Sequence, residues 1–227
     1  MSLILNIETG TNVCSVALAK DGQVLALKES NEGMEHGRLL SPFIQSVLEQ
    51  QNIQPSQLNA VAVSEGPGSY TGLRIGVATA KGICYGIGKP LIAVGSLHAL
   101  TTLALQQNVA ADLFCPMVDA RRMEVYTALF DSNFTLVEEV SAKIVDENSY
   151  AELLKNKCIA FFGNGADKCK AVVQSPNAIF LDIQQSTQGM VAIAEQKYSK
   201  SDFVDTAYFE PFYLKDFVVT KSKKQLL

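Results

Sequence analysis

The order of two kinds of apolar spacing along the first half of the chain most constrains its fold. Residues 3–8, 13–19 and 23–29 have the alternating or β-rich pattern of strands, and Asp21-Gly22 is a strong hairpin signal between the last two. From residue 36 the apolar positions recur at three and four, which is typical of helices. The segments that follow are a predicted helix over 36–51, strand over 60–64, helix over 71–87, strand over 91–94 and helix over 96–107.

Three strands followed by alternating helices and strands are the pattern of one ribonuclease-H-like lobe. The second half is less regular, with predicted strands at 113–118, 124–130, 134–140, 158–162 and 178–182 and predicted helices at 147–155 and 187–198. We therefore predict an α/β protein of the actin/Hsp70-like (ribonuclease-H-like) fold, with two lobes and mixed sheets flanked by helices. Residues 1–108 form the larger lobe, and residues 109–227 form a smaller, reduced lobe with a basic tail.

Composition narrows the function classes. The net charge is −4 with only four arginines, so strong direct binding of a nucleic acid is not expected, although Lys221, Lys223 and Lys224 lie close together near the end. The five cysteines are scattered without a C-x-x-C pair, which disfavours a disulfide framework or structural zinc. No apolar run is long enough to span a bilayer, and we expect a cytoplasmic protein without a membrane contact.

Two glycine-containing turns are candidates for phosphate contacts. Residues 8–11, Glu-Thr-Gly-Thr, end the first strand where actin-fold ATPases carry an aspartate, and an ordinary hairpin turn is the alternative. With Glu8, Thr9, Gly10 and Thr11 we group three residues of the second lobe as a vestigial nucleotide site: Asp119, Gly163 and Gly165. The loop 65–76 lacks the Lys-Ser/Thr of a P-loop and the spacing of a nucleophile elbow.

Metal and catalytic residues are not predicted anywhere in the chain. The only histidines are His36 and His98, and neither belongs to an H-x-x-x-H or H-E-x-x-H pair. Asp119 is followed by Arg121, Arg122 and Glu124, which form either a charged cluster facing a cleft between the lobes or a local salt-bridged turn.

The helices at 36–51 and 71–87 carry broader apolar arcs than a one-sided surface helix needs. One interpretation is mutual packing of the two helices, and the other is a joint docking face for another subunit. The residues of the predicted interface are Leu39, Leu40, Phe43, Ile44, Val47, Gly72, Ile75, Gly76, Thr79, Ala80 and Ile83. We expect Gly76→Leu to abolish docking while leaving the fold intact.

Several of these segments together resemble the bacterial TsaB (YeaZ) family. The similar segments are 7–9, 36–40, 65–82, 94–100 and 119–126, and the run from Gly66 to Gly76, GPGSYTGLRIG, is highly specific for that family and its catalytic paralogue. The likeness covers most of residues 1–130 and fades afterwards, apart from 212–214. Family members usually have Asp-Thr-Ser where this chain has 8–10, and Ser-Glu where it has Gly37-Arg38.

The resemblance implies a dimerisation subunit for threonylcarbamoyladenosine synthesis on tRNA. It implies a heterodimer with the catalytic paralogue TsaD, a small ATPase TsaE joining that pair, and tRNA contact only through the complex. A homodimer of the isolated chain stays open. No cofactor is firmly implied, with ATP or ADP at the complex interface as the open case. The alternatives from other classes are an autonomous actin-fold ATPase or phosphotransferase, for which Glu8 and Asp119 are the obvious acids, and a glycopeptidase-like hydrolase.

Overall fold

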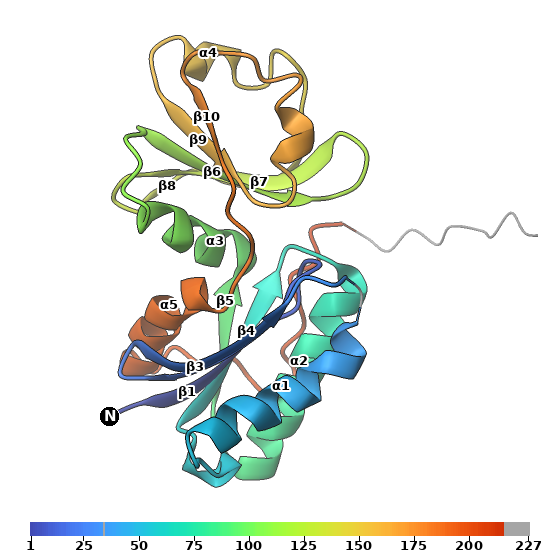
Figure 1. Ribbon diagram of the computed structural model, residues 1–227, viewed down its shortest axis with the longest axis vertical. Helices are drawn as coiled ribbons and strands as arrows, with labels where there is room; N and C mark the ends of the chain where they lie inside the picture. Colours follow the sequence, from blue (N-terminus) through green and yellow to red (C-terminus); the bar gives the residue numbers. More distant parts are fainter. Residues whose placement is uncertain (34, 216–227) are drawn as a thin grey trace, which may run out of the picture.

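The computed structural model describes residues 1–33 and 35–215, which form two stacked lobes, each built on one five-stranded sheet (Figure 1). The first sheet contains β1 (Leu3–Glu8), β2 (Cys14–Lys20), β3 (Gln23–Ser30), β4 (Ala60–Gly66) and β5 (Leu91–Gly95) in the order β3-β2-β1-β4-β5. The first three strands are antiparallel neighbours, and β4 and β5 add in parallel. This is the mixed sheet that the strand and helix order predicted.

Helices cover both faces of the first sheet. Helices α1 (His36–Gln50) and α2 (Tyr70–Ile87) lie side by side on one face, and α5 (Gln188–Ser199) covers the other (Figure 1). The core on the α1/α2 side contains Leu5, Val16, Val47 and Val77, all nearly inaccessible to solvent. Apolar side chains alternate across β1, and Ile4 points to the opposite side, where it packs in a cluster with Met190 of α5.

The second sheet contains β6 (Leu113–Asp119), β7 (Glu124–Asp131), β8 (Leu136–Ile144), β9 (Ile159–Phe162) and β10 (Ala178–Leu181), in the order β10-β9-β6-β7-β8. Helix α3 (Ser96–Leu105) lies between the lobes, because it contacts β6 and β7 on one side and α5 on the other. A short α4 (Ala151–Leu154) and two 3-10 turns, Pro55–Gln57 and Asp167–Cys169, complete the elements.

The predicted helix at 147–155 is wrong in its first half, since only Ala151–Leu154 is helical. The Ser149 hydroxyl accepts from the backbone N–H of Asp146 at 2.9 Å, and the Asp146 carboxylate accepts from the backbone N–H of Asn148 at 3.0 Å. These local side-chain bonds hold a turn in place of the first helical turn.

The predicted boundary near residue 108 separates the strands of the two sheets, but part of residues 109–215 packs on the first sheet. Helix α5 packs on the first sheet, and Val204 then pairs with Leu91 of β5 through a backbone hydrogen bond of 3.0 Å. Because residues 188–209 return to the first lobe, that lobe is built from both ends of the described chain. The lysines at 221–224 lie outside the described residues. Among the described helices none is long and apolar enough to cross a membrane.

Candidate functional site

The turn after β1, where the sequence placed a phosphate site, is closed by the chain itself. Glu8 is fully buried, and its Oε1 accepts hydrogen bonds from the Gly10 N–H at 2.5 Å and the Ser64 hydroxyl at 2.8 Å. Its Oε2 accepts from Nε2 of Gln185 at 3.0 Å, and the same Nε2 donates to the carbonyl of Ser96 at 2.9 Å. Gln185 comes from the segment that joins β10 to α5, so a residue from far along the chain donates a hydrogen bond to the Glu8 carboxylate.

Burial raises the pKa of Glu8, and its three hydrogen bonds and the nearby His36 oppose that rise. The buried Oε1 of Gln185 and Oγ of Ser96 have no hydrogen-bond partner among the described residues. The cluster is therefore a compact polar joint between the first sheet, α3 and the segment before α5.

The loop before α2 closes the other side of this turn. The N–H of Ser69 donates to the carbonyl of Gly10 at 2.7 Å, and the Thr9 hydroxyl donates to the carbonyl of Gly72 at 2.8 Å. A Cβ on Gly68 would lie 2.3 Å from the carbonyl oxygen of Gly10. Glycine is needed at position 68 because the backbone of this loop touches the backbone of the turn after β1 and leaves no room for a side chain.

The three second-lobe members of the predicted nucleotide site do not complete it. Asp119 is exposed and forms an ion pair with Lys168, while Gly163 and Gly165 pack against the backbone of β6. A Cβ on Gly163 would approach the carbonyl of Met117 to 2.4 Å. Gly163 and Gly165 therefore allow the backbone of their loop to pack closely against β6. In the part of the chain that the structure describes, no group of three His, Cys, Asp or Glu residues could hold a metal ion.

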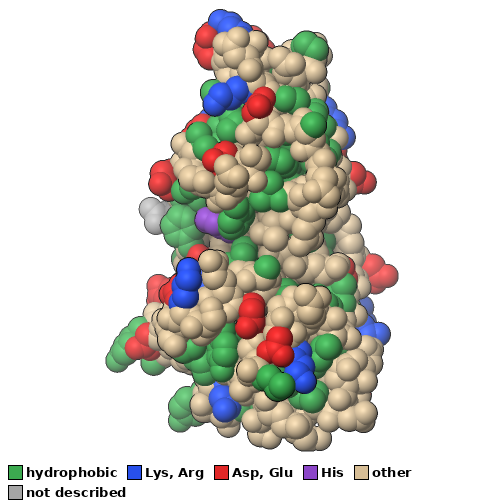
Figure 2. All heavy atoms as spheres, turned by 90° about the vertical axis from the view of Figure 1, so that its left-hand side faces the viewer, with side chains coloured by type: hydrophobic (Ala, Val, Ile, Leu, Met, Phe, Trp, Pro, Cys, Tyr) green, Lys and Arg blue, Asp and Glu red, His purple; other side chains and the backbone are tan. Residues whose placement is uncertain are grey.

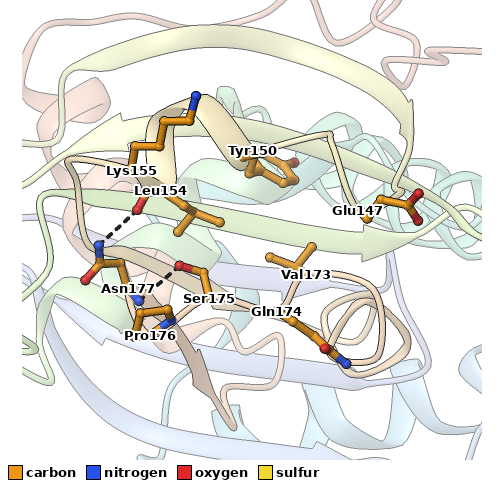
Figure 3. A pocket seen from close by; sticks show the side chains of 10 residues that line it. Glu147, Tyr150, Leu154, Lys155, Val173, Gln174, Ser175, Pro176 and Asn177 are labelled. Atoms are coloured by element: carbon orange, nitrogen blue, oxygen red, sulfur yellow. Dashed lines mark hydrogen bonds between the residues drawn. The ribbon is translucent and has the colours of Figure 1, made fainter.

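A cavity of about 370 Å³ in the second lobe lies away from this joint, between α4 and residues 173–177. Figure 3 shows Lys155 and Glu147 on opposite sides of it, with the apolar groups of Leu154 and Val173 between them. Asn177 donates to the carbonyl of Leu154 at 2.9 Å. The charged groups are thus separated and do not converge on one point as they would in a catalytic site.

Helices α1 and α2 bury most of the predicted interface in the chain's own core. Leu40, Ile44, Val47, Gly72, Gly76 and Ala80 are buried, so they do not form an exposed surface. The glycines are small for internal reasons, since a Cβ on Gly72 would lie 2.0 Å from the carbonyl of Thr9 and one on Gly76 would lie 2.3 Å from its Oγ1. The expectation that Gly76→Leu leaves the fold intact is therefore wrong.

The remaining five predicted residues are only partly buried and form a mostly apolar strip on the two neighbouring helices, which we call the seam. This seam consists of Leu39 and Phe43 of α1 and Ile75, Thr79 and Ile83 of α2. Phe43 and Ile83 also pack onto the core below, which fixes their positions. The buried and the partly exposed members of the predicted interface thus lie on different faces of the same two helices.

Next to the seam, α2 exposes small residues that are not part of the predicted interface. Ala78, Gly82 and Gly86 are spaced by four and lie on the outward face, and a Cβ added to either glycine would meet nothing within 4 Å. Each glycine costs a helix interior roughly 0.5–1 kcal/mol relative to alanine. The spacing of glycines was visible in the sequence, but their opposite orientations were not. Tyr85, 89% exposed, follows on the same side.

Residues 205–213 lie along the other flank of α2. The Lys81 ammonium donates to the carbonyls of Ala207 at 3.0 Å and Phe209 at 2.9 Å. Arg74 donates through Nε to the Tyr213 hydroxyl at 3.1 Å. We call residues 205–213 the strap. The strap covers this flank of α2, so the uncovered surface of the helix consists of the seam and the small-residue strip beside it.

Comparison with known proteins agrees with this architecture. The family model described as TsaD, tRNA N6-adenosine threonylcarbamoyltransferase, matches residues 30–218. The tRNA threonylcarbamoyladenosine biosynthesis protein TsaB of Escherichia coli (strain K12) is 30% identical over 226 residues, covering 96% of each chain. The TsaB of Bacillus subtilis (strain 168) is 33% identical over 177 residues, covering 75% of each.

A solved structure supports the same assignment at the level of the fold. A Pseudomonas aeruginosa protein described as similar to the peptidase YeaZ superposes with a TM-score of 0.83 at 23% identity, over 95% of this chain and 100% of that one. The two lobes and mixed sheets are those of the actin-like fold class that the sequence predicted. The chain belongs to the TsaB (YeaZ) family of tRNA threonylcarbamoyladenosine biosynthesis proteins.

Proposed function

We propose that this chain is a non-catalytic subunit that docks through the α1/α2 seam onto TsaD and thereby orders the catalytic subunit. The observation that carries the proposal is the seam itself: Leu39, Phe43, Ile75 and Ile83 remain partly exposed while they pack against the core. Preorganised apolar groups bind a partner with little loss of side-chain freedom. The open strip at Gly82 and Gly86 allows a partner's backbone to approach closely.

A hollow next to the small-residue strip of α2 adds a place for a partner side chain. It measures about 600 Å³ and is lined by Gly82, Tyr85, Lys89 and Ala207 among others. Its lining is shared between the end of α2 and the strap, so it continues the uncovered surface of α2. A bulky apolar group entering there would exclude water around the small-residue strip.

The closed joint at Glu8 supports a role without independent nucleotide chemistry. A magnesium-dependent phosphotransferase needs accessible acids that converge on the metal and phosphate. Glu8 is fully buried under Gln185, and Asp119 forms an ion pair with Lys168. These contacts disfavour the autonomous ATPase, and the absence of converging metal ligands among residues 1–33 and 35–215 disfavours a metal-dependent glycopeptidase. In our proposal any ATP or ADP lies at the complex interface, and TsaE joins the heterodimer of this chain with TsaD.

The test is reconstitution with TsaD from the same organism, followed by gel filtration and an assay of tRNA threonylcarbamoylation. Gly82→Leu adds bulk in open space, and Phe43→Glu places a charge in the seam. We expect both variants to lose the heterodimer and the complex-dependent activity while keeping the wild-type circular dichroism spectrum.

Val137→Glu is the matched control, because Val137 is 53% exposed on β8, away from both helices. It should assemble like the wild type. A heterodimer that tolerates both Gly82→Leu and Phe43→Glu would refute the docking face. ATP turnover by the purified chain that depends on Glu8 would instead favour the autonomous enzyme.

A further inference from the structure

Two connections of the described chain run between the two lobes. The first leads from β5 through α3 to β6, and the second joins β10 to α5 over residues 182–187. On the face that Figure 2 shows, the atoms of the two lobes are in continuous contact. Residues 185–187 of the second connection are buried, although they lie between elements. Their polar groups must therefore find hydrogen-bond partners inside the protein.

The second connection passes from the core of one lobe to the polar joint of the other within a few residues. Ile183 packs in an apolar cluster with Phe114 of the second sheet. Two residues later, Nε2 of Gln185 donates to Oε2 of Glu8 at 3.0 Å and to the carbonyl of Ser96 at 2.9 Å. Ser96 is the first residue of α3 and so belongs to the first connection. The side chain of Gln185 thus ties both connections to the end of β1.

A second set of contacts holds the same connection to β2 and β3. The N–H of Thr187 donates to Oγ of Ser15 at 2.9 Å, and the two hydroxyl oxygens lie 2.7 Å apart. The Ser15 hydroxyl donates in turn to Oε1 of Glu29 at 2.7 Å. Helix α5 then begins in close contact with α3, because a Cβ on Gly189 would lie 2.1 Å from the carbonyl oxygen of Ala99. The path of the chain between the lobes is therefore fixed on both sides.

The Glu8 carboxyl group is the point at which these segments converge. Its Oε1 accepts from the N–H of Gly10 and from the hydroxyl of Ser64 on β4, while its Oε2 accepts from Gln185. Movement of Gln185 away from the joint would leave Oε2 of Glu8 and the carbonyl of Ser96 without this donor. Loss of a partner is costly for a buried polar group, and Glu8 is fully buried.

We propose that Glu8 and Gln185 form a lock that fixes the orientation of the second lobe relative to the first. Rotation of one lobe against the other has to bend the chain at both connections, and the lock joins these connections to each other and to the first sheet. The lock does not rest on the proposed function, because Glu8 and Gln185 are buried and are not part of the seam. Its consequence is that the chain presents the surfaces of its two lobes at a fixed spacing.

The test is a distance measurement between the lobes by pulsed electron paramagnetic resonance on the full chain. Of the five cysteines, only Cys158 is not buried, and it lies in the second lobe. Spin labels are attached there and at Gln50→Cys, an exposed position of α1 in the first lobe. We expect a single narrow distance distribution in this background and a broader distribution once Gln185→Leu is added. The matched control is Gln184→Leu, which changes an exposed neighbour of the same type and should keep the distribution narrow.

A second variant serves if leucine at position 185 prevents folding. Gln185→Asn keeps the amide but is shorter by one methylene, so it cannot donate to both Glu8 and Ser96. It should broaden the distribution while the circular dichroism spectrum stays that of the wild type. A distribution as narrow as that of the control in a folded Gln185 variant would overturn the lock. Assembly with TsaD is measured separately, and its failure would refute the proposed function and leave the lock standing.

Hydrogen exchange of the unmodified chain tests the lock without any variant. The N–H of Thr187, which donates to Ser15, should exchange as slowly as the amides in the middle of β1, because it opens only when the lobes come apart. Exchange of this amide at the rate of an exposed loop would show that the connection opens by itself, and the lock would then be refuted.

Discussion

Two glycines of α2 are predicted to respond in opposite directions to the same substitution. Gly72 and Gly82 lie on one helix, ten residues apart. A Cβ at Gly72 would lie 2.0 Å from the backbone carbonyl oxygen of Thr9, whereas a Cβ at Gly82 would meet nothing within 4 Å. Gly72→Ala must therefore push α2 away from the turn after β1, and Gly82→Ala only removes the conformational freedom of glycine in the unfolded chain.

The magnitudes follow from these two environments. Alanine in a helix interior is favoured over glycine by about 0.5–1 kcal/mol, which is the whole effect expected at Gly82. Overpacking a core costs typically 1–3 kcal/mol, and Gly72 belongs at the upper end, because a backbone atom cannot rotate away as a side chain does. We expect a net loss of about 2 kcal/mol for Gly72→Ala. For a domain of this size, 1 kcal/mol shifts Tm by about 2–4 °C.

The assay is thermal and urea unfolding followed by circular dichroism, with the two alanine variants and the wild type measured side by side. Tm should rise by about 1–4 °C for Gly82→Ala and fall by about 4–8 °C for Gly72→Ala. A neutral or stabilising Gly72→Ala would refute the close packing of α2 on Thr9. The buried glycines would then be available to a partner, as the sequence alone suggested.

Three further predictions test the joint, the strap and the thiols. Burial raises the pKa of Glu8, so the stabilising contribution of this group is present below the ordinary pKa of 4.5 and is lost as the pH rises through the pKa of the folded state. The unfolding free energy of the wild type minus that of Glu8→Gln, from urea titrations at pH 4–8, should therefore fall with rising pH. A difference that does not change with pH would contradict the buried carboxylate. Lys81→Met removes two hydrogen bonds to the strap and should cost about 1–3 kcal/mol and speed proteolysis within residues 205–213, which limited digestion with mass mapping would detect. Burial raises the pKa of Cys115 to about 11, so a thiol reagent at pH 8 should label the partly exposed Cys158 well before Cys115, and equal rates would contradict the burial of Cys115.

The sequence was sufficient for the elements and their order in the first lobe. Apolar spacing of two in β1 and of three and four in α1 follows from which side chains must be buried, and this pattern is local. Asp21 and Gly22 both adopt positive φ, so the hairpin between β2 and β3 was also encoded locally. The specific run from Gly66 to Gly76 led to the family, which the comparison with TsaB proteins confirmed.

Only the tertiary structure decided which surfaces are covered. Spacing by four places Gly72 and Gly76 on one line and Gly82 and Gly86 on another, but it does not say which line meets β1, because that depends on how α2 docks. Gln185 closes the Glu8 site and Tyr213 covers Arg74 from more than 130 residues away in the chain. Periodicity within a segment reports that a face is buried, and contacts between distant segments determine what buries it.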